Sequence, residues 1–142
     1  MNQYQVISLD SLLSGGNLAV KEAVGDFSCK FNPEIDDYLR DKAIDFTRKS
    51  ITVTHLVFDA ETASCLGYFA LTHKPIAFQS KSLSGTQRKR IERFAKVNSD
   101  TNTYNVSAFL IAQIGKNYLV EDGNLISGAE LLGLAKKELL SA

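Results

Sequence analysis

The sequence predicts a single domain of the α/β (α+β) class, and three observations lead to this prediction. The chain has 142 residues, the size of one compact domain. Its content of 44% hydrophobic and 23% charged residues is typical of a protein that folds around an apolar core. Amphipathic segments that begin with helix caps alternate with segments rich in β-branched residues. Helices and strands are therefore expected to share one core.

The first half of the chain predicts a helix followed by two strands. Asn32 is a favoured cap, and the proline and glutamate that follow it suit the first turn, so a helix is expected from here to about Lys49. The alternating, β-branched stretch Ile51–Phe58 predicts a strand, and Cys65–His73 predicts the second strand of a hairpin. Pro75 is expected to end or bend that second strand.

The second half predicts a short helix, a buried strand and a final helix. Thr86 follows a Ser/Gly-rich stretch and could cap a helix that runs through Phe94. Both alternating sets of Tyr104–Gly115 are largely apolar, which predicts a central strand covered on both faces. Ser127 and Glu130 fit the capping box S-x-x-E at the start of an amphipathic helix.

Overall charge and cysteine usage exclude several classes of protein. Sixteen Lys and Arg balance sixteen Asp and Glu, so the chain as a whole lacks the positive charge typical of nucleic-acid and membrane-surface binders. No apolar stretch approaches the roughly 20 residues of a membrane helix. Cys29, Cys65 and the two histidines show no metal-ligand spacing, and the start of the chain lacks signal-peptide features. A cytoplasmic protein without metal is expected.

The basic run Arg88–Arg90 has two interpretations. It could contact nucleic acid, and steeply salt-dependent binding would be the sign of that role. Glu92 follows closely, however, and no aromatic residues are interleaved, so a solvated helix face is favoured over a DNA-binding signal.

Common enzyme motifs are absent from the sequence. It contains no G-x-x-x-x-G-K-[ST], G-x-G-x-x-G, H-E-x-x-H or G-x-S-x-G pattern. What remains is the strand Tyr104–Gly115 leading into the helix capped by Ser127. The start of such a helix directs free N–H groups and the positive end of the dipole at a ligand, and a phosphate is one candidate. An ordinary connection between a strand and a helix is the alternative.

Two further segments carry a resemblance to a known family. Phe27–Cys29, followed by Pro33–Leu39, resembles the "F-x-C…PEIDxYL" opening of a bacterial branch of the GNAT-fold N-acetyltransferases that includes acetyltransferase toxins. Leu66–Leu71 resembles the "LGYYTL" strand of that branch. The resemblance covers roughly residues 20–142 and implies a GNAT-like mixed, mostly antiparallel sheet flanked by helices. Because family domains continue beyond the last helix, it also implies that the C-terminal part of the fold is missing.

The resemblance implies acetyl-CoA-dependent transfer of an acetyl group to a primary amine, without a metal. Backbone pairing with the pantetheine is implied for Ile111, Ala112, Gln113, Ile114 and Gly115. Contact with the pyrophosphate is implied for Leu125, Ile126, Ser127, Gly128, Ala129 and Glu130.

The glycine signature that normally receives the pyrophosphate is degenerate. Aligned on Gly128, the family pattern Q/R-x-x-G-x-G/A meets Gly123 and Ile126 at its first two signature positions, and Glu130 adds a negative charge. Lys116 is the nearest upstream cation. Weak or unusual affinity for CoA is therefore expected.

The family chemistry needs a base for the amine proton and an acid, often a tyrosine, for the departing thiolate. His73 is the candidate base, because an unperturbed histidine titrates near working pH and His55 falls at an interior strand position. Tyr68 and Tyr104 are the candidate acids by resemblance. The alternative to a catalytic role is a packing role for the two tyrosines and an exposed position at a strand end for His73.

The acyl acceptor is left open by the sequence. An antitoxin and a second copy of the chain are candidate partners, and a catalytically silent remnant that binds protein is the alternative function. An uncovered edge of Tyr104–Gly115 and an uncovered leucine-rich face on the last helix would favour a dimer, or a product of a longer reading frame.

Overall fold

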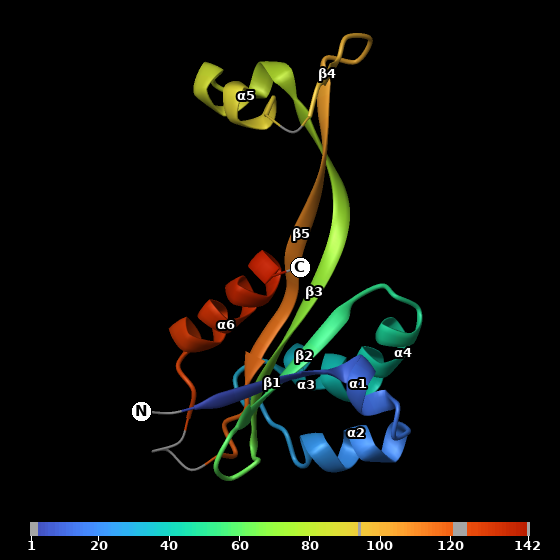
Figure 1. Ribbon diagram of the computed structural model, residues 1–142, viewed down its shortest axis with the longest axis vertical. Helices are drawn as coiled ribbons and strands as arrows, with labels where there is room; N and C mark the ends of the chain where they lie inside the picture. The colour runs from blue at the N-terminus through green and yellow to red at the C-terminus, as the bar shows by residue number, and fades with distance from the viewer. Residues whose placement is uncertain (1–2, 94, 121–124, 142) are drawn as a thin grey trace. The chain divides into compact units, whose positions relative to one another are not determined.

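A computed structural model describes residues 3–93, 95–120 and 125–141. The predicted mixture of helices and strands is confirmed (Figure 1). In chain order the elements are β1 (Tyr4–Ser8), α1 (Leu9–Leu13), α2 (Asn17–Val24), α3 (Pro33–Asp37), the π-helical turn η1 (Tyr38–Lys42), α4 (Ala43–Arg48), β2 (Val53–Asp59), β3 (Cys65–Gln79), the 3-10 turn η2 (Ser80–Ser82), α5 (Gly85–Ile91), β4 (Val97–Asn98), β5 (Thr103–Lys116) and α6 (Gly128–Ser141).

The strands form one five-stranded antiparallel sheet in the order β1-β2-β3-β5-β4. β1 pairs with β2 from Tyr4 opposite Asp59 to Ser8 opposite His55. β2 pairs with β3 starting at Val53 opposite Leu71. The mostly antiparallel sheet expected from the sequence is therefore confirmed.

Contacts within the chain define two compact units. We call residues 1–72 together with 111–142 the core unit, and residues 73–110 the hairpin unit. β3 and β5 contribute residues to both units.

Helices cover both faces of the sheet in the core unit (Figure 1). On one face, side chains of β2 and β3 pack against α1 to α4, among them Leu56, Phe58, Tyr68, Ala70, Leu9, Val20, Leu39 and Ala43. On the other face, β2 and β3 pack against α6 and the residue before its cap, with Val57, Leu66, Phe69, Leu71, Ile126, Leu131 and Ala135. β3 is buried without interruption from Cys65 to Leu71, so it is the central strand of this unit.

The prediction that Tyr104–Gly115 is covered on both faces is wrong. Phe109 on β5 is 53% exposed, and Ala112 is exposed as well. Apolar content on both sides of a strand does not require burial, because much of the accessible surface of any protein is apolar.

The helix predicted to begin at Asn32 is present, but it contains a π-helical turn. The Asn32 side chain accepts a hydrogen bond from the Glu34 N–H at 3.1 Å, as expected of a cap. The turn η1 separates α3 from α4 and buries Tyr38, whose hydroxyl lies 2.7 Å from Thr52 Oγ1 and 3.0 Å from Thr54 Oγ1. A buried hydroxyl network thus ties the helix to the start of β2.

Pro75 does not end its strand, which was one of the two predicted outcomes, because β3 continues to Gln79. The pairing of β2 with β3 begins at Leu71, so beyond this residue β3 has β5 as its one neighbour among the described strands. Proline is tolerated in a strand where its missing N–H faces no partner.

In the hairpin unit, α5 is capped by Ser84 and not by Thr86. Ser84 Oγ accepts from the Gln87 N–H at 3.1 Å, and Gln87 Oε1 accepts from the Ser84 N–H at 2.9 Å. This reciprocal capping box satisfies two N–H groups at once, which explains why it prevails over a cap at Thr86.

Candidate functional site

The start of α6 forms the capping box that the sequence predicts. Ser127 Oγ accepts from the Glu130 N–H at 3.0 Å, and Glu130 Oε1 accepts from the Ser127 N–H at 3.3 Å. The first two residues of the helix are Gly128 and Ala129, whose N–H groups have no acceptor inside an α-helix. The helix therefore presents two backbone donors and the positive end of its dipole.

Space is available beside these donors. Apart from its chain neighbours and the backbone of its own helix, a Cβ built on Gly128 would meet no described atom within 4 Å. Ile126 is 1% exposed and packs into the apolar cluster between the sheet and α6, and Leu125 is half-buried. The side chain of Ile126 thus fills the core, which accounts for a bulky residue at a position where the family pattern has glycine.

Glu130 places a negative charge at the same helix terminus. Its Oε2 accepts a hydrogen bond from the Tyr4 hydroxyl. The hydrogen bonds from Tyr4 and then from Ser127 lower the pKa of the Glu130 carboxyl below its ordinary value. The carboxylate therefore stays ionised at neutral pH and opposes an incoming anion.

The C-terminal end of β5 has one edge toward β3 and one open edge. The Asn117 N–H donates to the Leu66 carbonyl on β3 at 2.8 Å. Successive backbone groups of a strand alternate in direction, so those of Lys116 and Ile114 face the other edge, and those of Gly115 face β3. The neighbour of β5 on that other edge, β4, pairs with Thr103 and Tyr104, so within the described residues no strand covers Ile114 or Lys116.

The predicted cofactor strand is therefore present, but its residues differ in orientation. Ile111 and Ile114 both pack against the cluster under α6, although a regular strand would send side chains three residues apart to opposite faces. This indicates a break in the alternation between them. The hydrogen bond of the Asn117 N–H therefore determines the backbone direction of the adjacent residues Ile114, Gly115 and Lys116 only.

Two lysines and two aromatic rings gather where β5 ends. Lys116 Nζ lies 4.9 Å from the centroid of the Tyr118 ring. Lys30 Nζ lies 5.5 Å from the same centroid and 5.3 Å from that of Phe31, and the two rings meet edge to face at 5.0 Å. Sequence reasoning singled out Lys116 alone, because Lys30 and Phe31 are distant in the chain.

Tyr68 lies in the core of the unit. It is 0% exposed, its hydroxyl donates to the Ile35 carbonyl at 2.7 Å, and its ring stacks on Tyr38 at 5.8 Å between centroids. Burial raises the pKa of the Tyr68 hydroxyl well above its ordinary value. This placement favours a packing role over proton transfer.

Replacing Tyr68 with phenylalanine is expected to lower the free energy of unfolding by about 1–2 kcal/mol, because the Ile35 carbonyl loses a buried donor. Urea unfolding followed by circular dichroism measures the loss. Tyr118→Phe is the control, since the Tyr118 hydroxyl has no hydrogen bond to any described residue. An unchanged stability of Tyr68→Phe would contradict the assigned packing role.

The other two catalytic candidates belong to the hairpin unit. Tyr104 is 2% exposed, and its hydroxyl donates to Glu92 Oε1 at 2.7 Å. That hydrogen bond and burial raise the pKa of Tyr104. His73 is exposed, with its ring centroid 5.0 Å from that of Phe109. His73 therefore has the one accessible side chain of the three candidates.

His55 lies half-buried in the core unit and stacks on Phe69 at 5.1 Å between ring centroids. Burial lowers the pKa of His55 below its ordinary value, and the nearby charge of Glu138 opposes that shift. The folded chain thus favours the neutral imidazole.

The stability of the fold is expected to decline as pH falls below about 6.5, because unfolded His55 has the higher pKa and takes up the proton first. The contribution is present in full above that pH. Urea unfolding from pH 8 to pH 5 measures it. His55→Gln should flatten this part of the profile, whereas His73→Gln, at an exposed position, should retain it. A flat profile for the unmodified chain would contradict the expectation.

Neither the thiols nor the acidic and histidine side chains of the described residues form a metal-binding cluster. Cys29 and Cys65 are free thiols, and burial raises the pKa of Cys65 to about 12. Within residues 3–93, 95–120 and 125–141, no three or more His, Cys, Asp and Glu side chains cluster as metal ligands would. No helix in the same residues is long and apolar enough to cross a membrane.

An antiparallel sheet with helices on both faces, in which an open strand edge leads to a capped helix, is the arrangement expected of a GNAT-like fold, and solved structures are similar to it. The chain is similar to a tyrosine-to-phenylalanine mutant of KacT, with a TM-score of 0.61, 16% identity, and coverage of 97% of this chain and 68% of that chain. It is also similar to AtaT complexed with acetyl-methionyl-tRNAfMet, with a TM-score of 0.61, 11% identity, and coverage of 98% and 69%. A third structure, described as a bacterial toxin, gives a TM-score of 0.55, 14% identity, and coverage of 96% and 63%.

These comparisons confirm the predicted GNAT-like fold. No family model matches the chain, and no curated protein matches it. The chain spans about two thirds of the length of each of the three structures. At these identities the likeness establishes the fold alone.

Proposed function

We propose that this chain binds acetyl-CoA along the open edge of β5 and transfers its acetyl group to a primary amine. The observation that carries the proposal is the pair of backbone groups at Ile114 and Lys116, which face an edge that no described strand covers. An amide-bearing chain such as pantetheine pairs with such an edge as an added strand would.

Two features support a place for the pyrophosphate. The N–H groups of Gly128 and Ala129 open α6, and the space beside Gly128 is free of described atoms. Lys116 and Lys30 supply positive charge where β5 ends. The ionised Glu130 opposes them, which supports the expectation of weak affinity.

In the proposed reaction the amine nitrogen attacks the thioester carbonyl carbon, so that a C–N bond forms and the C–S bond breaks. Water or a base takes up the amine proton, and His73 stays the sequence prediction for that base because its side chain is the accessible one of the three candidates. The hydroxyls of Tyr68 and Tyr104 already donate to the Ile35 carbonyl and to Glu92. We therefore propose water as the source of the proton that the departing thiolate takes up.

The acceptor is proposed only as a primary amine. An acetylated aminoacyl-tRNA is the ligand named for the AtaT complex. For this chain, an antitoxin partner, a homodimer and a cytoplasmic setting stay proposals.

The test compares two substitutions at one position on the open edge. Ile114→Pro and Ile114→Ala both remove the packing of the isoleucine side chain, but Ile114→Pro alone removes the N–H that faces the edge. Acetyl-CoA at 100 times its Kd should stabilise the unmodified chain by about 2.7 kcal/mol. We expect Ile114→Ala to retain thermal stabilisation by acetyl-CoA and Ile114→Pro to lose it.

Calorimetric titration provides the second measurement. Absence of both heat and thermal stabilisation for the unmodified chain at millimolar acetyl-CoA would exclude the enzymatic function and favour a silent, protein-binding module. Equal stabilisation of Ile114→Pro and Ile114→Ala would exclude the strand-edge binding mode.

A further inference from the structure

The neutral sequence conceals a strong separation of charge between the two units. The whole chain has sixteen basic and sixteen acidic side chains. The hairpin unit holds seven of the basic residues and two of the acidic ones, a net charge of +5, so the core unit carries −5. The basic residues of the hairpin unit are Lys74, Lys81, Arg88, Lys89, Arg90, Arg93 and Lys96.

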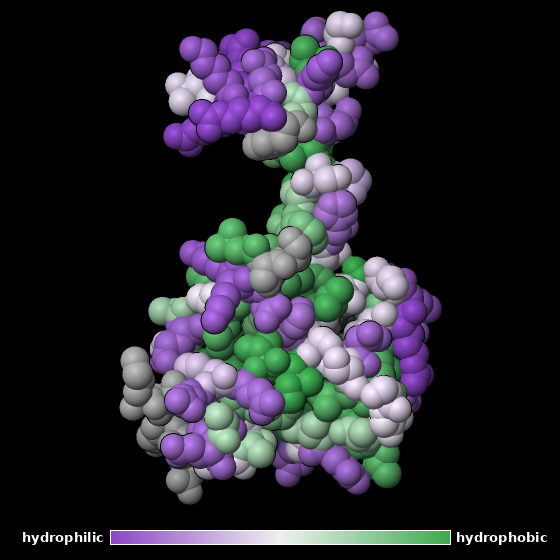
Figure 2. Space-filling view, in the orientation of Figure 1, coloured by the Kyte–Doolittle hydropathy of each residue, from purple (hydrophilic) through white to green (hydrophobic). Residues whose placement is uncertain are grey.

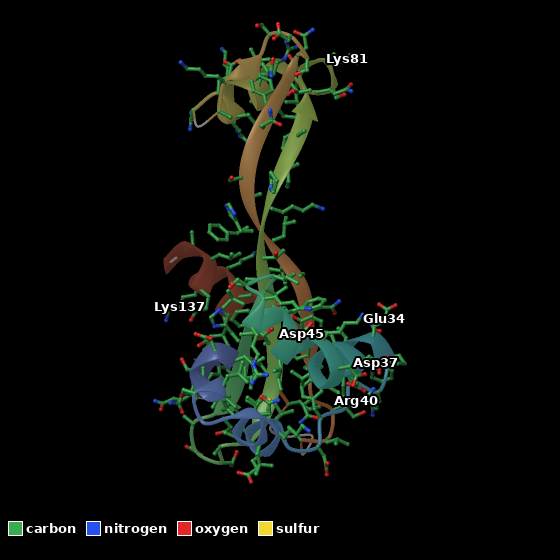
Figure 3. The ribbon with its side chains drawn as sticks, turned by 90° about the vertical axis from the view of Figure 1, so that its right-hand side faces the viewer. Glu34, Asp37, Arg40, Asp45, Lys81 and Lys137 are labelled. Carbon is green, nitrogen blue, oxygen red and sulfur yellow. The ribbon has the colours of Figure 1, made fainter. Side chains whose placement is uncertain are left out.

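The positive charge of the hairpin unit is exposed and uncompensated. All seven of its basic residues are exposed, and none forms a salt bridge with any residue that the structure describes. The described salt bridges lie on the helices of the core unit, as between Arg40 and Asp37, both labelled in Figure 3. Glu92, the acid nearest the basic helix in sequence, accepts the Tyr104 hydroxyl instead. Figure 2 shows a largely hydrophilic surface on the visible face of this unit.

A hollow of about 500 Å³ lies within the hairpin unit. Its lining combines Lys81 and Arg88 with the hydroxyl and amide side chains of Gln79, Ser80, Thr101 and Asn102. Lys81 is labelled in Figure 3. Two cations beside several neutral hydrogen-bonding groups form a setting that suits a phosphate.

Two aromatic side chains of the same unit are open to solvent. Phe78 on β3 is 37% exposed, and Phe109 on β5 is 53% exposed. Neither lies close in sequence to Arg88, and for this reason the basic run alone favoured a solvated helix face. The fold, in contrast, provides stacking platforms in the unit that carries the cations.

We infer that the hairpin unit binds single-stranded nucleic acid. The exposed lysines and arginines contact successive phosphates, the hollow between Lys81 and Arg88 holds one of them, and Phe78 and Phe109 stack on unpaired bases. The hollow that combines two cations with neutral hydrogen-bonding groups favours a phosphate-bearing ligand over an acidic protein, and competition by poly-glutamate distinguishes the two. The inference does not depend on acetyl transfer.

The test measures fluorescence anisotropy of a labelled 20-nucleotide poly-U RNA with the full chain at 50 mM salt and above. A triple variant, Arg88→Gln with Lys89→Gln and Arg90→Gln, should bind at least tenfold more weakly and reduce the salt slope by about 2. The control triple variant, Lys21→Gln with Lys136→Gln and Lys137→Gln, changes net charge equally at exposed positions of the core unit. It should retain nearly full affinity.

Further arms identify the ligand chemistry. Phe78→Ala and Phe109→Ala should each weaken binding about tenfold without changing the salt slope. If poly-dT DNA binds as tightly as the RNA, the unit recognises the phosphate backbone and the bases. If the RNA binds more tightly, the 2′-hydroxyl contributes to recognition. The inference is overturned if the unmodified chain does not bind at 50 mM salt, if both triple variants lose affinity equally, or if poly-glutamate competes as well as the oligonucleotide does.

Discussion

Gly115→Ala is expected to lower the free energy of unfolding by about 3 kcal/mol or more, at the upper end of the cost of overpacking a core. A Cβ on Gly115 would lie 2.2 Å from Cγ2 of Ile35, a separation that no pair of carbon atoms tolerates. Either β5 or α3 would have to move.

Both elements are held in place, so the clash is not relieved cheaply. Ile35 is 7% exposed, and its carbonyl accepts the hydroxyl of the buried Tyr68. On the sheet side, a Cβ built on Gly67 would lie 2.7 Å from the Gly115 carbonyl oxygen, which shows how closely β3 and β5 approach here. Gly115 is therefore required by packing, whatever its part in ligand binding.

A double-mutant cycle in urea measures this contact. Ile35→Ala alone should cost about 2–5 kcal/mol, and the double variant should cost at least about 1 kcal/mol less than the sum, because each change makes room for the other. Gly133→Ala on α6 is the control. A Cβ at this position would meet no described atom within 4 Å outside its chain neighbours and the backbone of its own helix, and alanine favours the helix more than glycine does, so this variant should be more stable by up to about 1 kcal/mol. Additive costs in the cycle would contradict the proposed contact.

The sequence predicted those helix caps and strands that depend on only a few neighbouring residues. The caps at Asn32 and Ser127 were predictable because each satisfies N–H groups two or three residues away. The strand at Leu66–Leu71 was predictable from its apolar, aromatic composition. The continuation of β3 past Pro75 was not, because it depends on which strands lie beside it.

In the candidate site, too, features set by neighbouring residues were predictable from the sequence, and features that bring together distant residues were not. The strand before α6 and its cap were visible in the sequence, whereas the cations beside Tyr118 were not, since Lys30 reaches that ring from a loop 88 residues away in the chain. The basic hairpin unit was obscured by averaging, because net charge over the whole chain cancels a local excess, and the bounds of the segment that carries this excess follow from the structure.

Asn117 is the second position at which a large loss of stability is expected. It is 5% exposed and lies just after β5. Its Nδ2 donates to the Cys65 carbonyl at 3.0 Å, and its Oδ1 accepts from the Ser28 N–H at 3.2 Å and from the Leu119 N–H at 3.1 Å. One amide side chain thus joins the loop before α3, the start of β3 and the segment after β5.

Asn117→Ala is expected to cost about 2–4 kcal/mol, because it leaves backbone groups of three segments without their partner in a buried place. Urea unfolding followed by circular dichroism measures the loss, and Asn105→Ala, at an exposed position of β5, should change stability little.

Asn117→Asp separates the two halves of the network: its oxygen still accepts from Ser28 and Leu119, but it replaces the donor to Cys65 with a second acceptor. It should therefore also be destabilised, and increasingly so as pH rises and the buried carboxyl ionises. Full stability of both Asn117 variants would show that the three segments hold together without this amide.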